Sequence, residues 1–103
     1  DRNQLYREVD GKIENVFTLK IINMDEQEHE YSVSVSGIEN IELIVDTKSV
    51  LAGPGSVLNV PVSLRADEDY LSGRSSDIEF RIETKERADL FTTEMARFLG
   101  PIQ

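Results

Sequence analysis

The 103-residue chain has no cysteine, no tryptophan and a single histidine. Without cysteine, these residues can form no disulfide, no thiolate metal site, no cysteine-ligated iron–sulfur cluster and no thiol nucleophile. One histidine is too few for the multi-histidine sites of catalytic zinc. No apolar run approaches the roughly 20 residues that a membrane-spanning helix needs. Catalysis by thiols, iron–sulfur clusters or multi-histidine zinc sites is therefore excluded for these residues.

Positive charge is also scarce, with 11 basic residues against 20 acidic ones and a net charge of −9. We therefore do not expect nucleic acid or an anionic membrane surface as a partner, because binding phosphate requires a positive field. The length predicts one domain over residues 1–103. The polar start, residues 1–4, has neither the basic region nor the apolar stretch of a signal peptide, and we expect the chain to be a fragment of a longer protein.

The dominant pattern is an alternation of apolar and polar residues with a period of two, which is typical of β-strands. Valine, isoleucine and aromatic residues fill the alternating runs, as a half-buried sheet prefers. The intervals between the runs are too short for the helical crossovers of a parallel sheet. The expected strands cover residues 13–23, 31–36, 41–45, 58–65 and 77–83.

The ends of the chain are less regular. Residues 5–9 are compatible with a short first strand. Residues 88–99 also fit a helix capped by Asp89, but we expect a last strand there, since a sandwich needs a partner for its open edge. Pro61 lies inside an expected strand and has no N–H to donate, which predicts an edge strand or a bulge at that point.

About seven strands in about 100 residues predict an all-β fold, an immunoglobulin-like (Ig-like) antiparallel β-sandwich without a disulfide. Its stability must come from apolar side chains, each contributing about 1.5–3 kcal/mol when fully buried. The expected core residues are Phe17, Leu19, Val33, Val35, Leu43, Val60, Val62, Ile78 and Phe80.

Two acidic segments contain the candidate metal ligands. Residues 25–30 place four carboxylates beside His29, directly after Met24, which suggests a hard-cation site or a copper patch. A solvated hairpin turn is the simpler interpretation, because the ligand spacing and the sharp glycine turn of a calcium cage are absent. Residues 67–70 are open to the same two interpretations, a calcium-binding loop or a solvated loop. The carboxylates near His29 predict a raised pKa for its imidazole.

No pattern typical of catalysis is present. His29 lies in a turn, and no serine stands in a Gly-x-Ser-x-Gly elbow. Asp77 and Glu79 are expected on one strand face rather than across a cleft. Residues 53–56 lack the Gly-Lys-Ser/Thr continuation of a phosphate loop. We therefore expect no catalytic residue, and an interaction surface formed by an edge strand or by end loops.

An ordered series in the first 23 residues resembles a known family. It consists of Asp1-Arg2-Asn3, Leu5-Tyr6-Arg7-Glu8, Gly11, residues 13–21 and Asn23, and the chain closes with Phe98-Leu99-Gly100-Pro101. The series resembles the C-terminal domain of the FixG/CcoG family, accessory proteins of cbb3-type cytochrome c oxidase assembly. The resemblance implies an Ig-like domain that follows the last transmembrane helix of an inner-membrane protein and faces the periplasm.

The resemblance also implies a redox function for the parent protein, which would carry cysteine-ligated 4Fe–4S clusters and reduce copper for delivery to the oxidase. Those ligands have no counterpart here, so we expect no cofactor in this domain. The resemblance and the residue chemistry together predict a non-catalytic extracytoplasmic interaction module. Its expected partner is an oxidase subunit, a copper-handling protein or a second copy of itself.

Two alternatives stay open. In the first, Met24 and His29 hold Cu(I) transiently, with Met95 as a remote third ligand, since thioether and imidazole suit that ion. In the second, the chain is a structural spacer or an adhesin-like sandwich unrelated to the family.

Overall fold

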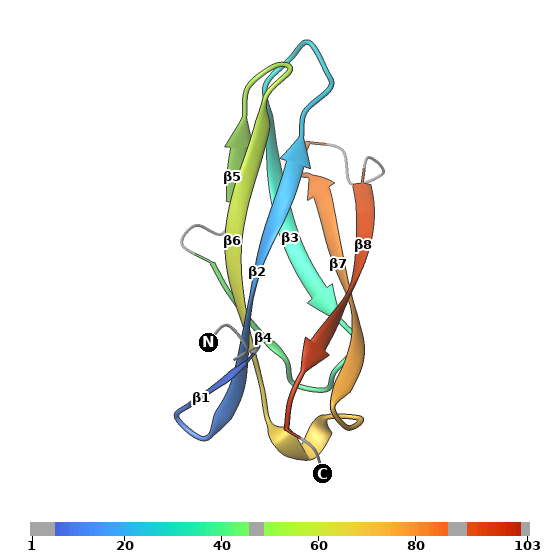
Figure 1. Cartoon of the computed structure of the whole chain (residues 1–103). Coiled ribbons are helices and arrows are strands. Elements are labelled where there is room, and N and C mark those ends of the chain that lie inside the picture. The colour runs from blue at the N-terminus through green and yellow to red at the C-terminus, as the bar shows by residue number, and fades with distance from the viewer. Residues whose placement is uncertain (1–5, 46–48, 87–90, 102–103) are drawn as a thin grey trace.

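Eight antiparallel strands and one 3₁₀ turn make up the structure, a computed structural model that describes residues 6–45, 49–86 and 91–101 (Figure 1). The all-β prediction is confirmed. Among the described residues, no helix has the length and hydropathy that crossing a bilayer requires. The elements are β1 (Arg7–Val9), β2 (Lys12–Ile22), β3 (His29–Ser36), β4 (Glu42–Ile44), β5 (Ser49–Ala52), β6 (Val57–Ala66), η1 (Glu68–Tyr70), β7 (Ser75–Thr84) and β8 (Phe91–Leu99).

The strands form two four-stranded sheets packed face to face (Figure 1). One sheet has the order β1-β2-β6-β4 and the other the order β5-β3-β7-β8, with all neighbours antiparallel. β1 covers only the start of β2, where Arg7 to Val9 pair with Lys12 to Glu14. The remainder of β2 and the whole of β8 therefore lie at sheet edges, and they lie on the same side of the sandwich.

Apolar side chains from both sheets fill the space between them. The ring of Phe17 in β2 meets the ring of Phe80 in β7 edge-on, with centroids 5.4 Å apart. Of the predicted core, Leu19, Val62, Ile78 and Phe80 are buried, and Phe17, Val33, Val35, Leu43 and Val60 are half-buried against them. Further core residues that the sequence analysis missed are Ile13, Ile38, Leu64, Ala66 and Phe98.

The structure has one strand more than expected among its described residues. β5 is not among the expected strands, because four residues are too few to establish an alternation. Pro61 in β6 pairs with Thr18 of β2, whereas β4 covers only Ser63 to Arg65. Pro61 therefore stands on an uncovered stretch of strand, as predicted from its missing N–H group.

Both uncertain ends of the chain are strands. Residues 91–99 form β8 and pair with β7 along its length, while residues 88–90 of the predicted segment lie outside the described residues. Near the N-terminus β1 begins at Arg7, and Leu5 also lies outside the described residues. Asp10 and Gly11, with φ of 51° and 80°, form the tight turn between β1 and β2. Two successive positive φ angles are the signature of a type I′ hairpin, which favours Asp-Gly.

Candidate binding surface

Glu14, a member of the resembling series, ties three strands together. Its side chain is 2% exposed and accepts hydrogen bonds from Arg7 Nε at 2.5 Å and from Arg65 Nε at 2.9 Å. The three residues are cross-strand partners in β1, β2 and β6. The hydrogen bond from Arg65 first, and that from Arg7 next, hold the pKa of Glu14 below its usual value despite burial. This carboxylate is therefore structural, because both of its oxygens are already bound within the sheet.

Asn15, the next residue of the series, joins the two sheets. Its Nδ2 donates to the carbonyl oxygen of Leu99 at 2.9 Å, and its Oδ1 accepts from the Leu99 N–H at 2.8 Å. The side-chain amide thus takes the place of a neighbouring strand at the end of β8. It closes the lower end of the side on which β2 and β8 face each other.

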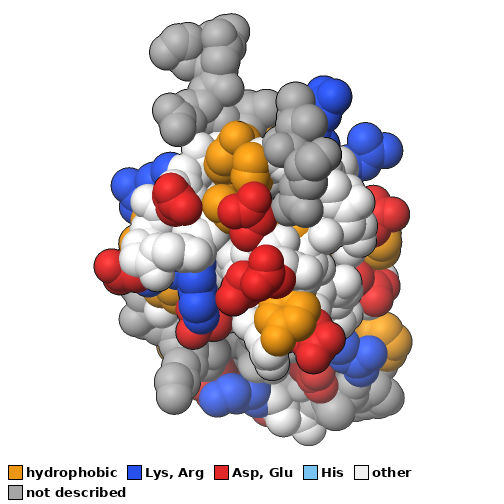
Figure 2. All heavy atoms as spheres, turned by 90° about the horizontal axis from the view of Figure 1, so that it is seen from below, with side chains coloured by type: hydrophobic (Ala, Val, Ile, Leu, Met, Phe, Trp, Pro, Cys, Tyr) orange, Lys and Arg blue, Asp and Glu red, His pale blue; other side chains and the backbone are white. Residues whose placement is uncertain are grey.

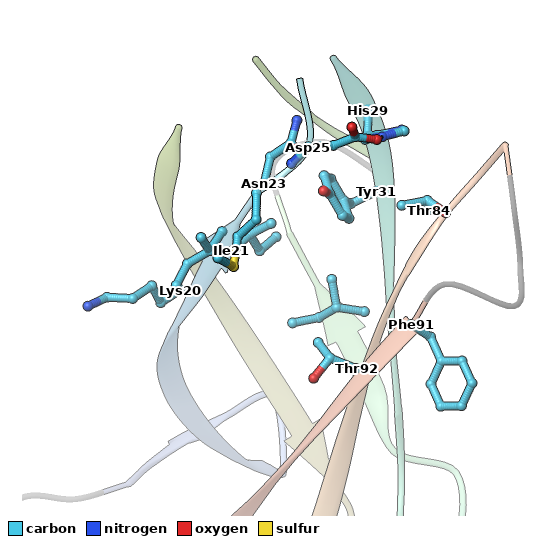
Figure 3. Close-up of a pocket in the computed structure, with 12 residues that line it drawn as sticks. Lys20, Ile21, Asn23, Asp25, His29, Tyr31, Thr84, Phe91 and Thr92 are labelled. Atoms are coloured by element: carbon cyan, nitrogen blue, oxygen red, sulfur yellow. The ribbon is translucent and has the colours of Figure 1, made fainter. Parts of the chain in front are cut away.

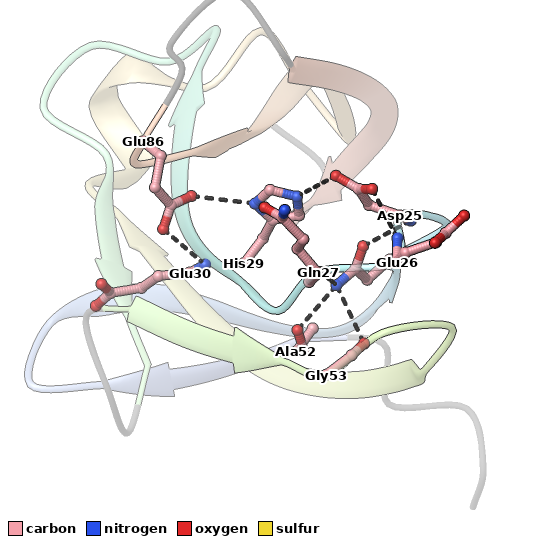
Figure 4. Close-up of polar contacts among 9 residues, drawn as sticks. Asp25, Glu26, Gln27, His29, Glu30, Ala52, Gly53 and Glu86 are labelled. Atoms are coloured by element: carbon pink, nitrogen blue, oxygen red, sulfur yellow. Dashed lines mark hydrogen bonds and ion pairs between the residues drawn. The ribbon is translucent and has the colours of Figure 1, made fainter.

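Asn23 organises the opposite end of the sandwich. Its side chain is buried, and Nδ2 lies 2.9 Å from the carbonyl oxygens of Gln27 and Ala52 and 3.1 Å from that of Gly53. Its Oδ1 accepts from the N–H of Asp25 at 2.9 Å. Figure 4 shows these contacts joining the β2–β3 turn to the end of β5. The sequence analysis placed Asn23 only at the start of a turn, because alternation does not reveal a buried amide.

The acidic turn, residues 25–30, holds His29 between two carboxylates (Figure 4). Nε2 of His29 lies 2.6 Å from Asp25 Oδ2, and Nδ1 lies 3.3 Å from Glu86 Oε1. These bonds, that to Asp25 first, raise the pKa of His29, as predicted. The pKa of Asp25 is lowered in turn, chiefly by the same bond. Both ring nitrogens are therefore engaged within the protein.

Two of the three candidate copper ligands line one pocket. Met24, 89% exposed, and His29 both contribute to an open pocket of about 230 Å³, whereas Met95 is not among its lining residues. A metal ion at His29 would have to displace Asp25 or Glu86 from the imidazole. Among the residues that the structure describes, no three His, Asp or Glu side chains form a group suited to a metal ion.

The second acidic segment, residues 67–70, caps a short turn. Asp67 precedes η1, and its side chain accepts a hydrogen bond from the Asp69 N–H at 3.0 Å. Asp67 is therefore an N-cap residue, whose carboxylate accepts a hydrogen bond from an otherwise unpaired backbone N–H.

The two sheets separate at the upper end of the side formed by β2 and β8. The inward positions of β8 pass from buried Phe98 and half-buried Ala96 to exposed Glu94 and Thr92. Figure 3 shows Tyr31 and Thr92 directed into the opening, which is the pocket described above, and the Phe91 ring turned away from it.

A second open pocket, of about 390 Å³, continues the opening along β8. It shares Lys20, Ile22, Ile82 and Thr92 with the first pocket and adds Thr93 and Glu94. We call this opening, bounded by residues 20–22 of β2 and 91–94 of β8, the β2–β8 seam. Sequence analysis missed it, although polar residues at inward positions of β8 were a signal.

The opposite end of the sandwich has a different surface. Figure 2 shows acidic and basic side chains interspersed over its described part, with small, separated apolar areas. At the seam, by contrast, Ile22 is 52% exposed and Phe91 is 50% exposed, close to the freely exposed Met24. Exposed apolar side chains that gather beside a pocket mark an interaction site more often than scattered ones do. The seam is therefore the candidate binding surface.

The chain was compared with curated proteins, protein families and solved structures. No curated protein matches it. Residues 1–101 match the family model described as an Ig-like fold at the C-terminal of FixG, a candidate oxidoreductase. The crystal structure of a FixG-related protein from Vibrio parahaemolyticus aligns with a TM-score of 0.83 and 37% sequence identity, over 96% of this chain and 88% of that chain.

Proposed function

Because the chain belongs to the family of Ig-like domains at the C-terminus of FixG, we propose that it is a non-catalytic interaction module of a FixG-like membrane protein. The module stands on the extracytoplasmic side and docks a protein that takes part in copper reduction and delivery and in the assembly of cbb3-type cytochrome c oxidase. The family match over residues 1–101 is the observation that carries this proposal.

The residue chemistry supports a docking role rather than a reactive one. Thiolates are the usual ligands of 4Fe–4S clusters, and the chain has no cysteine, so its residues do not fit such a cluster. The buried polar side chains of Glu14, Asn15 and Asn23 are occupied by contacts that hold the sandwich together. The surface that we assign to docking is the seam, where exposed apolar side chains lie beside a pocket.

Removal of residues 1–103 from the full-length parent protein tests the proposal. We expect the amount of assembled oxidase, measured by its haem spectrum and activity in membranes, to fall while the parent protein still accumulates. Replacement of the domain by an unrelated Ig-like sandwich is the matched control for a spacer role. Normal assembly without the domain, or full rescue by the unrelated sandwich, would overturn the docking role.

A second candidate function, transient Cu(I) handling, is favoured by one observation: Met24 and His29 line the same pocket. Cu(I) titration of the chain, with Met24→Ala and His29→Ala as variants, tests it. Binding tighter than micromolar that both variants weaken would support this function. Binding that neither variant changes would end it. The contacts of His29 with Asp25 and Glu86 make docking the stronger candidate, because copper would have to break one of them.

A further inference from the structure

Among the residues that the structure describes, the edge of β8 is unpaired along most of its length. β8 is the last strand of its sheet, and its one described partner strand is β7. In an antiparallel strand, alternate residues direct their N–H and C=O groups to opposite sides. Leu99 bonds outward to Asn15, whereas Gly100 bonds inward to the carbonyl of Arg74 at 3.0 Å. The residues that share the outward direction of Leu99 are Phe91, Thr93, Met95 and Arg97.

Within the described part of the chain, these four residues present a row of backbone donors and acceptors without a partner. Asn15 satisfies the row only at Leu99, and the hydrogen bonds of the described residues include no partner for the backbone of the other four. Such an edge is a ready template for an added strand, and peptide recognition by strand addition uses it. The start of the strand is held in place, since the Arg81 guanidinium lies 3.7 Å from the Phe91 ring centroid.

The inner side of this edge is open and can receive side chains. An added strand would direct every second side chain into the β2–β8 seam, where Ile22 and Ile82 form apolar walls. Glu94 also faces the seam. Lys20 of β2 lines the same pocket, but among the described residues no cation lies within ion-pair distance of Glu94. An inward charge usually blocks an edge strand against association, unless the partner brings the opposite charge.

Charge also decides between a partner protein and a second copy of the chain. In two antiparallel β8 strands, the register that pairs all four free residues places Glu94 opposite Glu94 of the second copy. Like charges directly opposite destabilise a strand pair, and each chain carries a net charge of −9. A basic segment instead meets a favourable charge at Glu94 and is attracted by the whole domain.

We propose that residues 91–97 of β8 accept an extended segment of a partner protein, which places a lysine or arginine against Glu94 and apolar side chains in the β2–β8 seam. The proposal rests on the docking function above and names the site and the chemistry of the partner. Main-chain hydrogen bonds to the edge provide affinity, and the charge at Glu94 provides selectivity.

A synthetic peptide is the first probe, acetyl-Thr-Val-Thr-Lys-Thr-Val-Thr-amide, in which the lysine and both valines share one face. The matched control peptide has glutamate in place of lysine. We expect the lysine peptide to bind several-fold more tightly, because an opposite-charge cross-strand pair raises affinity by up to about fivefold and the glutamate peptide meets a like charge instead. Amide exchange at Thr93, Met95 and Arg97 slows on binding, and NMR reads this at each residue. The amides that bond to β7 are slow with or without peptide.

Two variants locate the site. Thr93→Pro removes an N–H that β7 does not use, so the fold is retained and peptide binding is lost. Glu94→Lys inverts the preference, and the glutamate peptide then binds more tightly than the lysine peptide. Urea unfolding of both variants checks that the sandwich is intact.

Several outcomes would overturn the proposal. They are no slowing of exchange at about 1 mM peptide, equal binding of the two peptides, protection along β2 in place of β8, or a dimer of the free chain whose β8 amides are already protected. In the full-length parent, Thr93→Pro separates this proposal from the docking function. If deletion of the domain abolishes oxidase assembly and Thr93→Pro does not, the domain docks through another surface.

Discussion

Replacing Asn23 by alanine should destabilise the whole upper end of the sandwich. The buried amide of Asn23 contacts three carbonyl oxygens and one N–H. Asn23 directly follows β2, and its partners Ala52 and Gly53 lie at and just past the end of β5. Each net hydrogen bond contributes about 0.5–1.5 kcal/mol, and a buried group left unpaired costs more. The carbonyls of Gln27 and Gly53 lie near the surface and can be hydrated after the change. We therefore expect a loss of about 2–4 kcal/mol in the free energy of unfolding.

Replacing Asn23 by aspartate gives the sharper result, because shape is retained and the donors are lost. The carboxylate then faces three carbonyl oxygens, so at neutral pH this variant should be less stable than Asn23→Ala. Burial among these oxygens raises the pKa of the new carboxyl. Its destabilisation is full at neutral pH and is relieved as the pH falls below that raised pKa, when the protonated group again donates.

Urea unfolding at about pH 7 and about pH 4 measures both effects. Asn59→Ala is the matched control, since Asn59 lies on the exposed face of β6 and should change stability by less than about 0.5 kcal/mol. The reasoning is refuted if Asn23→Ala costs less than about 1 kcal/mol, or if the gap between the aspartate and alanine variants is independent of pH.

Three further predictions concern other contacts. Glu14→Gln should lower the free energy of unfolding by about 1.5–3 kcal/mol at neutral pH. Because the pKa of Glu14 is lowered, its contribution is present above the usual glutamate range and is lost as the pH falls through the folded pKa. Urea unfolding at about pH 3 should therefore show a smaller difference in stability between the unchanged chain and the variant. The pKa of His29 is raised, so its contribution to the free energy of unfolding is full below its ordinary pKa and is lost as the pH rises through the folded value. His29→Gln should remove this part of the pH dependence of unfolding. The same pH dependence in the variant as in the unchanged chain would contradict the prediction. Gly37→Ala should cost about 2 kcal/mol or more in thermal or urea unfolding, since φ is 121° and the added Cβ would lie 2.6 Å from the Asp77 carbonyl oxygen. Gly11→Ala, which has positive φ but open space, is its control and should cost less.

The strands could be predicted from the sequence because alternation is a local property. In β3, the half-buried Tyr31, Val33 and Val35 alternate with serines, so a few residues suffice to identify strand and face. The same reasoning failed for β5, whose four residues are too few to alternate visibly. The family resemblance is confirmed by the family match. Three residues of the resembling series, Glu14, Asn15 and Asn23, prove to be structural, since they bond across strands and turns.

The sequence predicted the type of candidate site, an edge strand, but not which strand provides it. An edge strand was expected to form an interaction surface, and β8 is such a strand, but nothing local distinguishes it from the edge at β5. The pairing of His29 with Glu86, 57 positions away, also could not be predicted, although the effect of Asp25 on its pKa could. The effect of a charge close in sequence on the pKa of His29 follows from local geometry. The effect of a distant charge depends on the folded arrangement of the strands.

By itself, the sequence determined an all-β sandwich with a core free of sulfur bridges and a strongly acidic surface, because hydrophobic alternation and composition act residue by residue. Only the tertiary structure decided which polar groups are buried and which sheet edge stays open. Asn15 and Leu99 are 84 positions apart, yet their two hydrogen bonds close the end of the β8 edge, and no other described residue bonds to the rest of that edge. Such contacts exist only once two sheets have packed, since their geometry depends on the whole fold.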